Sequence, residues 1–373
     1  MEEFFDVVGE KDKMKITFII ANPNMSGGDR VCAIYAQKLM ILGHEVNIVA
    51  PKKKYLGFKK QIKRVLKGQS WLSKKDQSRN HFDFLGLKLV YSEDCASLMK
   101  KSVPDADVVI ATWWETAEWV NNFSDKKGEK VYFIQHHEIH EHLPKERVKA
   151  TYRYPFFKIT IANWLVSIMK SDYLDDNVAL VPNSVNHELF YASPRSRQIR
   201  PTIGFLFSET KFKGVITALS VIENLKKLIP DLRVIAFGSH APIIFDLPNY
   251  VELSISPKQE NIRLLYEQCD LWLCCSLIEG FGLTILEAMA CRTPSVSTKC
   301  GGPEDIITEG VNGYLCDVDD VDALTAASQR ILGFSEKEWL KFSDHAHEHA
   351  LGYSWNDAAR LFETALQQAI IKK

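Results

Sequence analysis

Two glutamates, Glu279 and Glu287, lie eight positions apart at the ends of the segment EGFGLTILE, separated by two glycines and several apolar residues. Eight residues of continuous helix would place the two carboxylates roughly 80° apart around the axis and about 12 Å along it. A turn at the glycines can instead fold Glu279 back over a helix start, where free backbone N–H groups form an anion site. Carboxylates that hold hydroxyls beside amides that hold phosphate suggest a nucleotide sugar as the ligand.

The residues around this segment predict that it is the turn between a strand and a helix. Residues 271–276 form an apolar run that predicts a buried strand, and residues 286–290 favour a helix by intrinsic propensity. The turn therefore contains Gly280 and Gly282, and the two acids are expected at the carboxyl edge of a sheet, where ligands of α/β folds bind.

The rest of the chain alternates short apolar runs with helical patterns, which predicts parallel sheets. The first half has expected strands at 15–20, 45–50, 107–111, 130–134, 158–162 and 177–181, with a glycine loop at 21–28 and a helix at 29–42 after the first strand. The pattern restarts after the polar segment 193–201, with strands at 202–207 and 232–238 and helices at 215–228 and 262–269. We predict an α/β protein of two doubly wound domains that face each other across a cleft.

The composition excludes several classes of protein. The 373 residues include 46 basic and 47 acidic side chains, so the overall charge does not indicate a nucleic-acid partner. No apolar run reaches the roughly 18 residues that span a bilayer, and residues 1–13 are too polar for a signal peptide. Of eight cysteines, Cys274, Cys275 and Cys291 lie in apolar runs, which indicates reduced core residues and a cytoplasmic protein.

The order of several short motifs resembles the retaining glycosyltransferase family often numbered four, the glycosyl transferases group 1, which has the GT-B fold. In chain order they are Gly27-Gly28 before a helix, VPNSVN at 181–186, Lys213-Gly214, the segment 279–287, GGPE at 301–304, NGY at 312–314 and YSW at 353–355. Each motif is weak alone, but their order and spacing over residues 14–365 are specific.

The resemblance implies two Rossmann-like domains with separate roles. Residues 14–196 would form the acceptor-side domain after an N-terminal tail at 1–13. Residues 197–350 would form the domain that binds the nucleotide sugar, and residues 351–373 would be a C-terminal helix that packs back on the N-terminal domain.

The resemblance also assigns residues around the donor. It implies that Glu279 lies beside the donor sugar, that Glu287 binds the ribose hydroxyls, and that Lys213 binds the diphosphate and stabilises its charge as it leaves. Backbone amides would contact the diphosphate at Phe281, Gly282, Leu283 and Thr284.

Two further positions leave alternatives open. Many relatives carry an arginine soon after the glycine that matches Gly204, but Phe205 follows here, so that role is vacant or is taken by Lys211. The glycines Gly27 and Gly28 would allow the backbone to approach the donor or the acceptor closely. The fingerprint G-x-G-x-x-G is absent, which argues against a nicotinamide enzyme.

A histidine-rich segment, QHHEIHEH at 135–142, follows an expected strand and should face the cleft. A zinc motif HExxH needs one more residue between its histidines than His137 and His140 provide, so we expect no metal site. The resemblance implies one catalytic-site side chain near the C6 hydroxyl of the sugar. It can be matched with Gln135 or His136, and we favour His136.

The segment 52–75 has a different character, with ten Lys or Arg residues and no acidic residue among aromatic and aliphatic ones. Apolar and basic positions alternate as two faces of a helix. This pattern is typical of a solvated basic helix, or of a surface for an anionic membrane or acceptor. The basic residues predicted to form this surface are Lys59, Lys60, Lys63, Arg64 and Lys67.

These observations predict a retaining transfer of a sugar from a UDP-, GDP- or dTDP-linked donor to a hydroxyl of a glycan or lipid-linked acceptor. No cofactor and no metal are expected, and the enzyme is expected on the inner face of a membrane as a peripheral protein. Two alternatives are a sugar-nucleotide epimerase of the same architecture and a non-catalytic subunit that binds nucleotide sugars.

Overall fold

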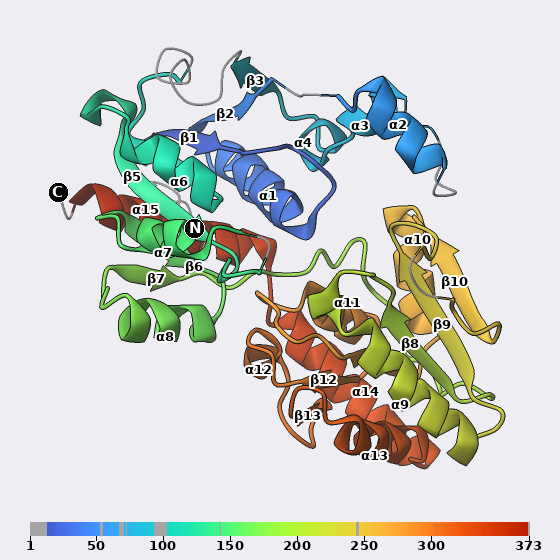
Figure 1. Ribbon diagram of the computed structural model, residues 1–373. Helices are drawn as coiled ribbons and strands as arrows, with labels where there is room; N and C mark the ends of the chain where they lie inside the picture. The colour runs from blue at the N-terminus through green and yellow to red at the C-terminus, as the bar shows by residue number, and fades with distance from the viewer. Residues whose placement is uncertain are drawn as a thin grey trace, which may run out of the picture.

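The protein folds into two α/β domains, each with a parallel sheet covered by helices (Figure 1). In this computed structural model the described residues are 13–52, 55–66, 71, 73–92, 103–141, 143–243 and 246–371.

In the described residues, the N-terminal sheet has seven strands in the order β3-β2-β1-β4-β5-β6-β7, and every neighbouring pair is parallel. The strands are β1 (Lys15–Ile19), β2 (Glu45–Pro51), β3 (Leu89–Ser92), β4 (Val108–Ala111), β5 (Glu129–Ile134), β6 (Phe157–Thr160) and β7 (Val178–Leu180). The strand order reverses between β1 and β4, so the loops after these strands open a crevice at the carboxyl edge of the sheet.

The described part of the C-terminal sheet has six parallel strands in the order β10-β9-β8-β11-β12-β13. They are β8 (Thr202–Leu206), β9 (Arg233–Gly238), β10 (Val251–Ile255), β11 (Leu271–Cys274), β12 (Ser295–Thr298) and β13 (Gly313–Cys316). Here the order reverses between β8 and β11, which places the loops after these two strands at the second crevice.

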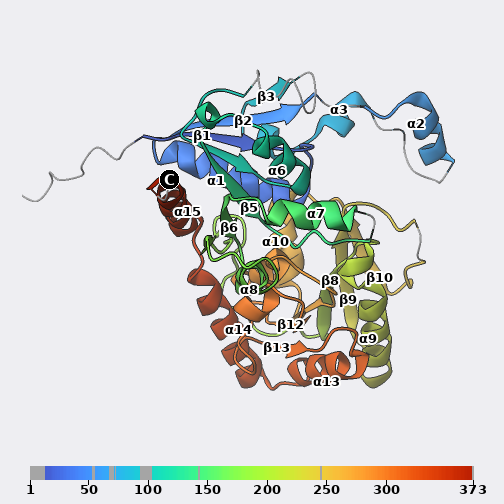
Figure 2. The ribbon, with the colours of Figure 1, turned by 60° about the vertical axis from the view of Figure 1, so that its left-hand side comes forward.

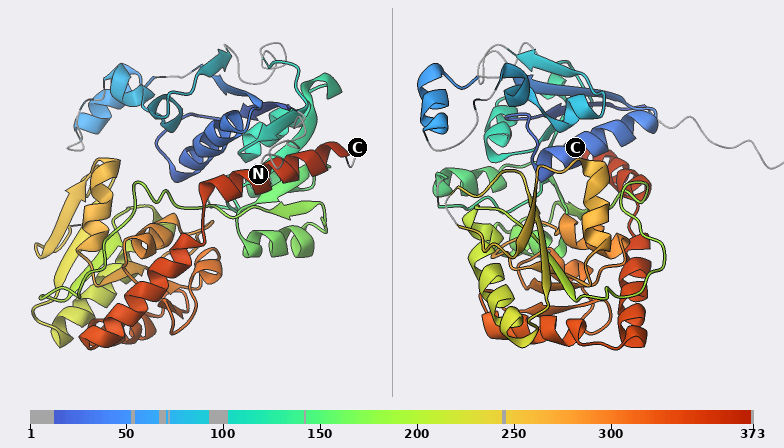
Figure 3. Two further views of the ribbon diagram at one scale, coloured as in Figure 1. Left: turned by 180° about the vertical axis from the view of Figure 1, so that it is seen from behind. Right: turned by 90° about the vertical axis from the view of Figure 1, so that its right-hand side faces the viewer.

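Helices cover both faces of each sheet, as right-handed parallel crossovers require (Figures 1 and 3). The first domain contains α1 (Gly27–Ile41), α2 (Phe58–Val65), α3 (Lys74–Ser78), α4 (His81–Phe84), α6 (Trp114–Asn121), η1 (Asp125–Lys127), α7 (Lys145–Tyr152) and α8 (Asn163–Asp172). The second contains η2 (Lys211–Lys213), α9 (Val215–Leu228), α10 (Gln259–Glu267), α11 (Leu283–Ala290), α12 (Pro303–Ile306), α13 (Val321–Leu332) and α14 (Glu336–Leu351).

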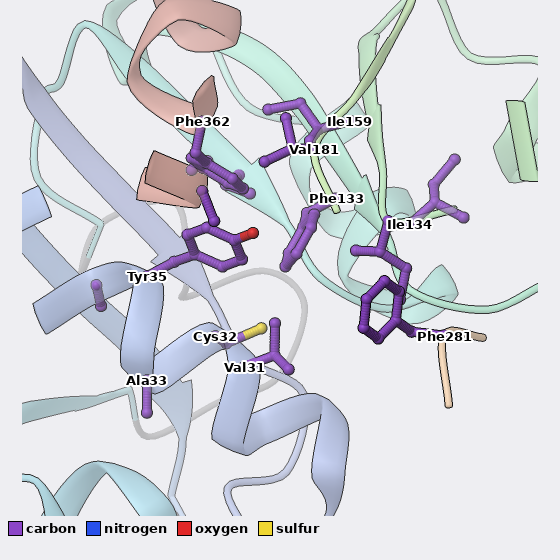
Figure 4. Packing of buried hydrophobic residues seen from close by; sticks show 14 of the residues in the cluster. Val31, Cys32, Ala33, Tyr35, Phe133, Ile134, Ile159, Val181, Phe281 and Phe362 are labelled. Carbon is purple, nitrogen blue, oxygen red and sulfur yellow. The ribbon is translucent and has the colours of Figure 1, made fainter. Parts of the chain in front are cut away.

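The last helix, α15 (Trp355–Ile371), leaves the C-terminal domain and packs on the N-terminal one (Figure 3). Phe362 stacks on Tyr35 of α1 with ring centroids 4.5 Å apart, and it meets Phe133 of β5 edge-on at 5.1 Å. Figure 4 shows these rings together, and Phe281 of the C-terminal domain beside Ile134 at the end of β5. The core of the N-terminal domain thus continues into the second domain.

The two domains are in close backbone contact at Gly280. A Cβ atom on Gly280 would lie 2.1 Å from the carbonyl oxygen of Gln135, so no larger residue fits between the two backbones. The indole Nε1 of Trp164 donates to the carbonyl of Gly280 at 2.9 Å, and Asn163 donates through its backbone N–H to Asp305 at 2.7 Å. These contacts hold the carboxyl edges of the two sheets face to face.

Several elements differ from the sequence-based expectation. Strands β3, β10, β12 and β13 were not predicted. Two of the four side chains of β3 are exposed at the sheet edge, and no apolar run marks it. Helix α1 begins at Gly27 rather than Asp29, since Ser26 caps it by accepting from the Asp29 N–H. Helix α11 begins at Leu283 rather than Leu286, because Gly282 adopts a left-handed conformation with φ 96° and starts the helix itself.

Candidate active site

A pocket lies at the switch point of the C-terminal sheet, where the loops after β8 and β11 meet. Its polar lining includes Lys213, Ser276, Glu279 and Thr284, and its floor is apolar, with Phe205 and Trp272. Three of the residues predicted from the sequence are therefore neighbours. Phe205, which follows Gly204 where many relatives carry an arginine, is part of this apolar floor.

Lys213 and Glu279 form an ion pair within this pocket. The Nζ atom of Lys213 lies 2.6 Å from Oε1 of Glu279, and the hydroxyl of Ser276 donates to the same oxygen at 2.7 Å. Burial alone would lower the pKa of Lys213, but the charge and hydrogen bond of Glu279 outweigh it and leave the pKa above its ordinary value. The lysine is therefore a fixed cation at neutral pH, half-buried and oriented by the carboxylate.

Gly214 fixes the position of Lys213. Gly214 has a left-handed conformation with φ 63° at the start of α9, and a Cβ atom there would lie 1.8 Å from the carbonyl oxygen of Cys275. The backbone N–H of Leu277 also donates to the carbonyl of Phe212 at 2.8 Å. The loop after β8 is thus held against the loop after β11, which brings the lysine to the glutamate.

The N-terminus of α11 points its free amides at the same pocket. The N–H groups of Ile285 and Leu286 both bond to the carbonyl of Gly282, and among the described hydrogen bonds those of Leu283 and Thr284 have no protein acceptor. Such amides at a helix start, with the positive end of the helix dipole, form an anion site. Phe281 contributes differently, because its side chain is buried and meets Tyr353 edge-on at 6.0 Å.

Glu287 is held on two sides in this structure. Its Oε2 accepts a hydrogen bond from the hydroxyl of the buried Tyr266 at 3.0 Å, and its Oε1 is paired with the guanidinium of Arg30, from α1 of the other domain. The Glu287 side chain is only 5% exposed. Burial, and then the charge of Glu287, raises the pKa of Tyr266 well above its ordinary value, so its hydroxyl stays a donor.

The N-terminal domain brings His136 to face the pocket. Its ring lies 6.0 Å from both Trp164 and Phe212, and the charges of Glu279 and Lys213 act on it. Burial lowers its pKa to about 4, so the imidazole is neutral at pH 7, and its Nε2 is buried without a hydrogen-bond partner. Gln135, the alternative match, turns its amide back into its own domain and donates to the carbonyl of Gly28 at 3.2 Å.

Three further residues were predicted to bind the donor: Gly27, Gly28 and Lys211. Gly27 and Gly28 form the first turn of α1 and have ordinary backbone conformations, and no protein atom would touch a Cβ on Gly27. Lys211 is exposed, and the described ion pairs and hydrogen bonds give its ammonium group no partner. The structure therefore shows Lys213, not Lys211, in contact with Glu279.

The other residues of the segment 135–142 contact different parts of the N-terminal domain. His137 bonds to the hydroxyl of Tyr173 at 2.9 Å, and Glu138 is buried, where its carboxylate accepts the backbone N–H of Trp114 at 3.1 Å. Within the described ranges, no three His, Cys, Asp or Glu residues lie together in a way that could hold a metal ion.

The predicted basic surface lies on α2, which projects from the N-terminal domain (Figure 2). Lys59, Lys60 and Lys63 are exposed and Arg64 is half-buried, whereas Lys67 lies outside the described residues. In the described part of the chain, no helix is both long and apolar enough to cross a membrane.

Three residues of this site were not predicted: Arg30, Tyr266 and Ser276. Ser276 ends the apolar run before Glu279, and Arg30 follows the glycine pair by two positions, so both stand beside recognised motifs. Their partners are set by the tertiary fold, and Arg30 and Glu287 are 257 positions apart in the chain.

Residues 194–343 match the sequence model of the family described as "Glycosyl transferases group 1". N-acetyl-alpha-D-glucosaminyl L-malate synthase of Bacillus anthracis is 41% identical over 170 residues, which are 42% of this chain and 44% of that protein. D-inositol 3-phosphate glycosyltransferase of Corynebacterium urealyticum is 30% identical over 174 residues, 42% of this chain and 41% of that protein. The matched regions therefore span less than half of these curated relatives.

Solved structures are similar over nearly the whole chain. Sucrose-phosphate synthase from Thermosynechococcus elongatus superposes with a TM-score of 0.75 and 15% identity, covering 97% of this chain and 100% of that one. HepE of Anabaena in complex with UDP gives a TM-score of 0.72 and 16% identity, covering 95% and 100%. At such identities the likeness establishes the fold, and the expected GT-B fold of two Rossmann-like domains is confirmed.

Proposed function

We propose that the chain is a retaining glycosyltransferase, and the premise is that residues 194–343 match the model of the glycosyl transferases group 1 family. It would move a sugar from a nucleoside-diphosphate donor to a hydroxyl of a glycan or lipid-linked acceptor. The observation that supports this most directly is the ion pair of Lys213 with Glu279, 2.6 Å long, in the pocket that also contains Thr284 at the start of α11.

Each part of the pocket has a role in this proposal. The amides of Leu283 and Thr284 and the charge of Lys213 bind the diphosphate, since preorganised donors act most strongly where negative charge develops. Glu279 accepts hydroxyls of the sugar and orients Lys213. Glu287 accepts hydroxyls of the ribose, and the neutral His136, whose Nε2 lacks a partner, contacts the sugar from the opposite domain.

The reaction breaks the bond between C1 of the sugar and the phosphate oxygen and forms a bond between C1 and the acceptor oxygen on the same face. The proton of the acceptor hydroxyl passes to the departing phosphate oxygen, so no separate base is required. The transition state has oxocarbenium character. Lys213 and the α11 amides stabilise the charge on the leaving group, and we propose that they do so without a metal.

The proposal is tested first by thermal shift with UDP, GDP, dTDP and their sugar conjugates. A ligand that binds only the folded protein raises its melting temperature by mass action, by about 2.7 kcal/mol of stability at 100 times Kd. The complexes of HepE with UDP and with UDP-glucose make UDP-glucose a reasonable first donor. A melting temperature that none of these compounds changes would contradict the proposal.

Product analysis separates the proposed function from its alternatives. A transferase releases nucleoside diphosphate only as sugar reaches an acceptor or water, and the transferred sugar keeps its anomeric configuration. An epimerase would need only water and would return an epimerised sugar. A non-catalytic subunit would bind the donor without turnover.

We also propose that α2 binds an anionic membrane surface. At about 100° per residue, Phe58, Ile62, Val65 and Leu66 fall within an arc of roughly 100°. This apolar arc points away from the protein, with Phe58 69% and Leu66 82% exposed, whereas Gln61 on another side is buried. Of the exposed lysines, Lys59 and Lys63 follow the arc on one side, and Lys60 lies on the opposite side of the helix.

An amphipathic helix with its apolar face exposed and lysines beside it fits the boundary between headgroups and acyl chains. Trp71, which meets Phe58 edge-on at 5.6 Å and is 51% exposed, enlarges the same apolar surface. A lipid-linked or otherwise anionic acceptor would then be delivered beside the cleft.

Co-sedimentation with vesicles tests the membrane proposal. Phosphatidylglycerol vesicles should bind the protein and phosphatidylcholine vesicles should not, and high salt should weaken the binding. Replacing Lys59, Lys60 and Lys63 by Gln should reduce affinity on the order of 10²-fold, at about 1 kcal/mol per charge. The same change at the exposed lysines Lys227, Lys337 and Lys341 is the matched control. Binding that ignores lipid charge, or that the control change reduces equally, would contradict the proposal.

A further inference from the structure

Both oxygens of the carboxylate proposed to bind ribose have protein partners in this structure. Tyr266 donates to one oxygen of Glu287 from the buried side, and Arg30 pairs with the other oxygen from the N-terminal domain. Tyr266 is fully buried, whereas the Arg30 side chain is 20% exposed. A ribose therefore reaches Glu287 from the side that Arg30 covers, and it must displace or share the contact of that guanidinium.

The charges of two ion pairs, one that lines the pocket and one at Glu287, favour an exchange. Lys213 and Arg30 carry two positive charges, and Glu279 and Glu287 carry two negative ones, so the four side chains sum to zero. Without Arg30 the sum would be negative, and a diphosphate would enter a site that repels it. Lys211, the other cation near this loop, is exposed.

Glu287 lies close to the proposed diphosphate site. Glu287 lies four residues beyond Leu283, the first residue of α11, so it is about 6 Å along the axis from the amides proposed to bind phosphate. The guanidinium is also incompletely satisfied where it stands, because its Nε is buried and has no acceptor. An arginine has five N–H donors in a fork that matches phosphate oxygens.

We infer that Arg30, although it belongs to the N-terminal domain, is a ligand of the donor diphosphate and passes from Glu287 to a phosphate as the ribose hydroxyls take the carboxylate. This inference rests on the proposed function. It makes donor binding depend on both domains, because one of the two cations that meet the diphosphate comes from α1.

The exchange predicts opposite effects on ligands with and without phosphate. In Arg30→Gln, UDP should bind on the order of 10- to 100-fold more weakly, the scale of hydrogen bonds to a charged group. Uridine should bind as well as before or more tightly, because no cation then competes for Glu287. Arg30→Lys should fall between wild type and Arg30→Gln for UDP, since it keeps the charge and loses the fork.

The test measures the affinity for UDP by calorimetry and the affinity for uridine by ligand-observed NMR at millimolar concentration. GDP with guanosine and dTDP with thymidine are substituted if one of them binds the wild type better. Arg147→Gln is the matched control, because Arg147 pairs with Glu118 on the surface at 2.6 Å, and it should change neither affinity.

The outcomes separate the inference from the proposed function. Equal weakening of UDP and uridine in Arg30→Gln would assign Arg30 to domain packing alone and overturn the inference, as would unchanged UDP affinity. Should Arg30→Gln not fold, Arg30→Lys decides by the same comparison of the two ligands. Failure of every nucleoside diphosphate to bind the wild type would overturn the proposed function, and the inference with it.

Discussion

Lys213 and Glu279 act as a unit, and the chemistry of the site depends on which of them is removed. Lys213 is the cation that the pocket directs at the diphosphate, and Glu279 fixes it at 2.6 Å. The backbone of the site is set by glycines and by the start of α11, so changes to these two side chains should leave the fold intact.

Lys213→Ala should lower kcat by about 10²- to 10³-fold, the range observed for removing one preorganised charge-stabilising donor. Lys211→Ala is the matched control, two residues away on the same loop and exposed, and it should have little effect. Steady-state release of the nucleoside diphosphate measures both. A larger loss in the Lys211 variant would show that the phosphate lysine is misassigned.

The two glutamates should differ in the parameter that their loss affects. Glu287→Ala should chiefly raise the KM for the donor, because hydroxyl binding at the ribose is shared by ground and transition states. Glu279→Ala should chiefly lower kcat, since it removes a contact at the reacting sugar and the group that orients Lys213. Small and equal effects of both substitutions on KM and kcat would make the two carboxylates structural.

His136 should make the protein less stable in acid. Its pKa is about 4 in the folded protein and near 6.5 when unfolded, so the unfolded chain binds more protons between these values. Its contribution to the free energy of unfolding is therefore complete above pH 6.5 and is lost as pH falls toward 4, by about 3 kcal/mol in total.

Urea unfolding of the wild type and of His136→Gln at pH 7 and pH 4.5 tests this contribution. The difference in unfolding free energy between the two proteins should shift by about 2 to 3 kcal/mol in favour of the variant at the lower pH. A difference that stays constant between the two pH values would refute the buried, neutral state of this histidine.

Among the connecting elements, the loop from β11 to α11 carries the closest approach between the domains. Gly280→Ala should force the backbones of Gly280 and Gln135 apart, because the added Cβ would lie 2.1 Å from the Gln135 carbonyl. We expect a more open molecule, with a larger radius of gyration in small-angle scattering and weaker donor binding. Gly57→Ala is the control, since Gly57 has φ of −66° and no atom within 4 Å of its Cβ position. The same radius of gyration in both variants would contradict this prediction.

The sequence predicts elements and local motifs much better than contacts between domains. The alternation of apolar runs located nine of the thirteen strands in the described residues and missed β3, β10, β12 and β13. Strand β3 lies at the sheet edge with two of its four side chains exposed, so no apolar run marks it. The motif at 279–287 identified Glu279, and the Lys-Gly pair identified Lys213, because their geometry is set within a few residues. The pairing of Arg30 with Glu287 could not be predicted, since it depends on how two separately folded sheets meet.

For the molecule as a whole, α15 makes the N-terminal domain depend on the end of the chain. Phe362 fills the space between Tyr35 and Phe133, and Glu363 meets the buried His44 at 2.9 Å. A chain that stops after Leu351 should lose the stability of the N-terminal domain, because the removed helix uncovers that core and leaves His44 without its carboxylate partner.

Thermal unfolding followed by circular dichroism measures this effect. The truncated chain should show a lower first transition, whereas the C-terminal domain should keep its own. Removing only the terminal dipeptide 372–373 is the control. An unchanged melting curve of the truncated chain would show that α15 is dispensable.

The return of α15 also means that the chain passes between the domains twice, once in residues 182–201 and once in residues 352–354. The two passages are tied together, because the ring nitrogen Nε2 of His187 lies 2.8 Å from the carbonyl oxygen of Tyr353. A single tether would let one body tumble about the other in any direction. Two adjacent connections restrict the motion of the domains to rotation about one hinge axis. Each closure should therefore return the pocket residues to the same alignment on every turnover.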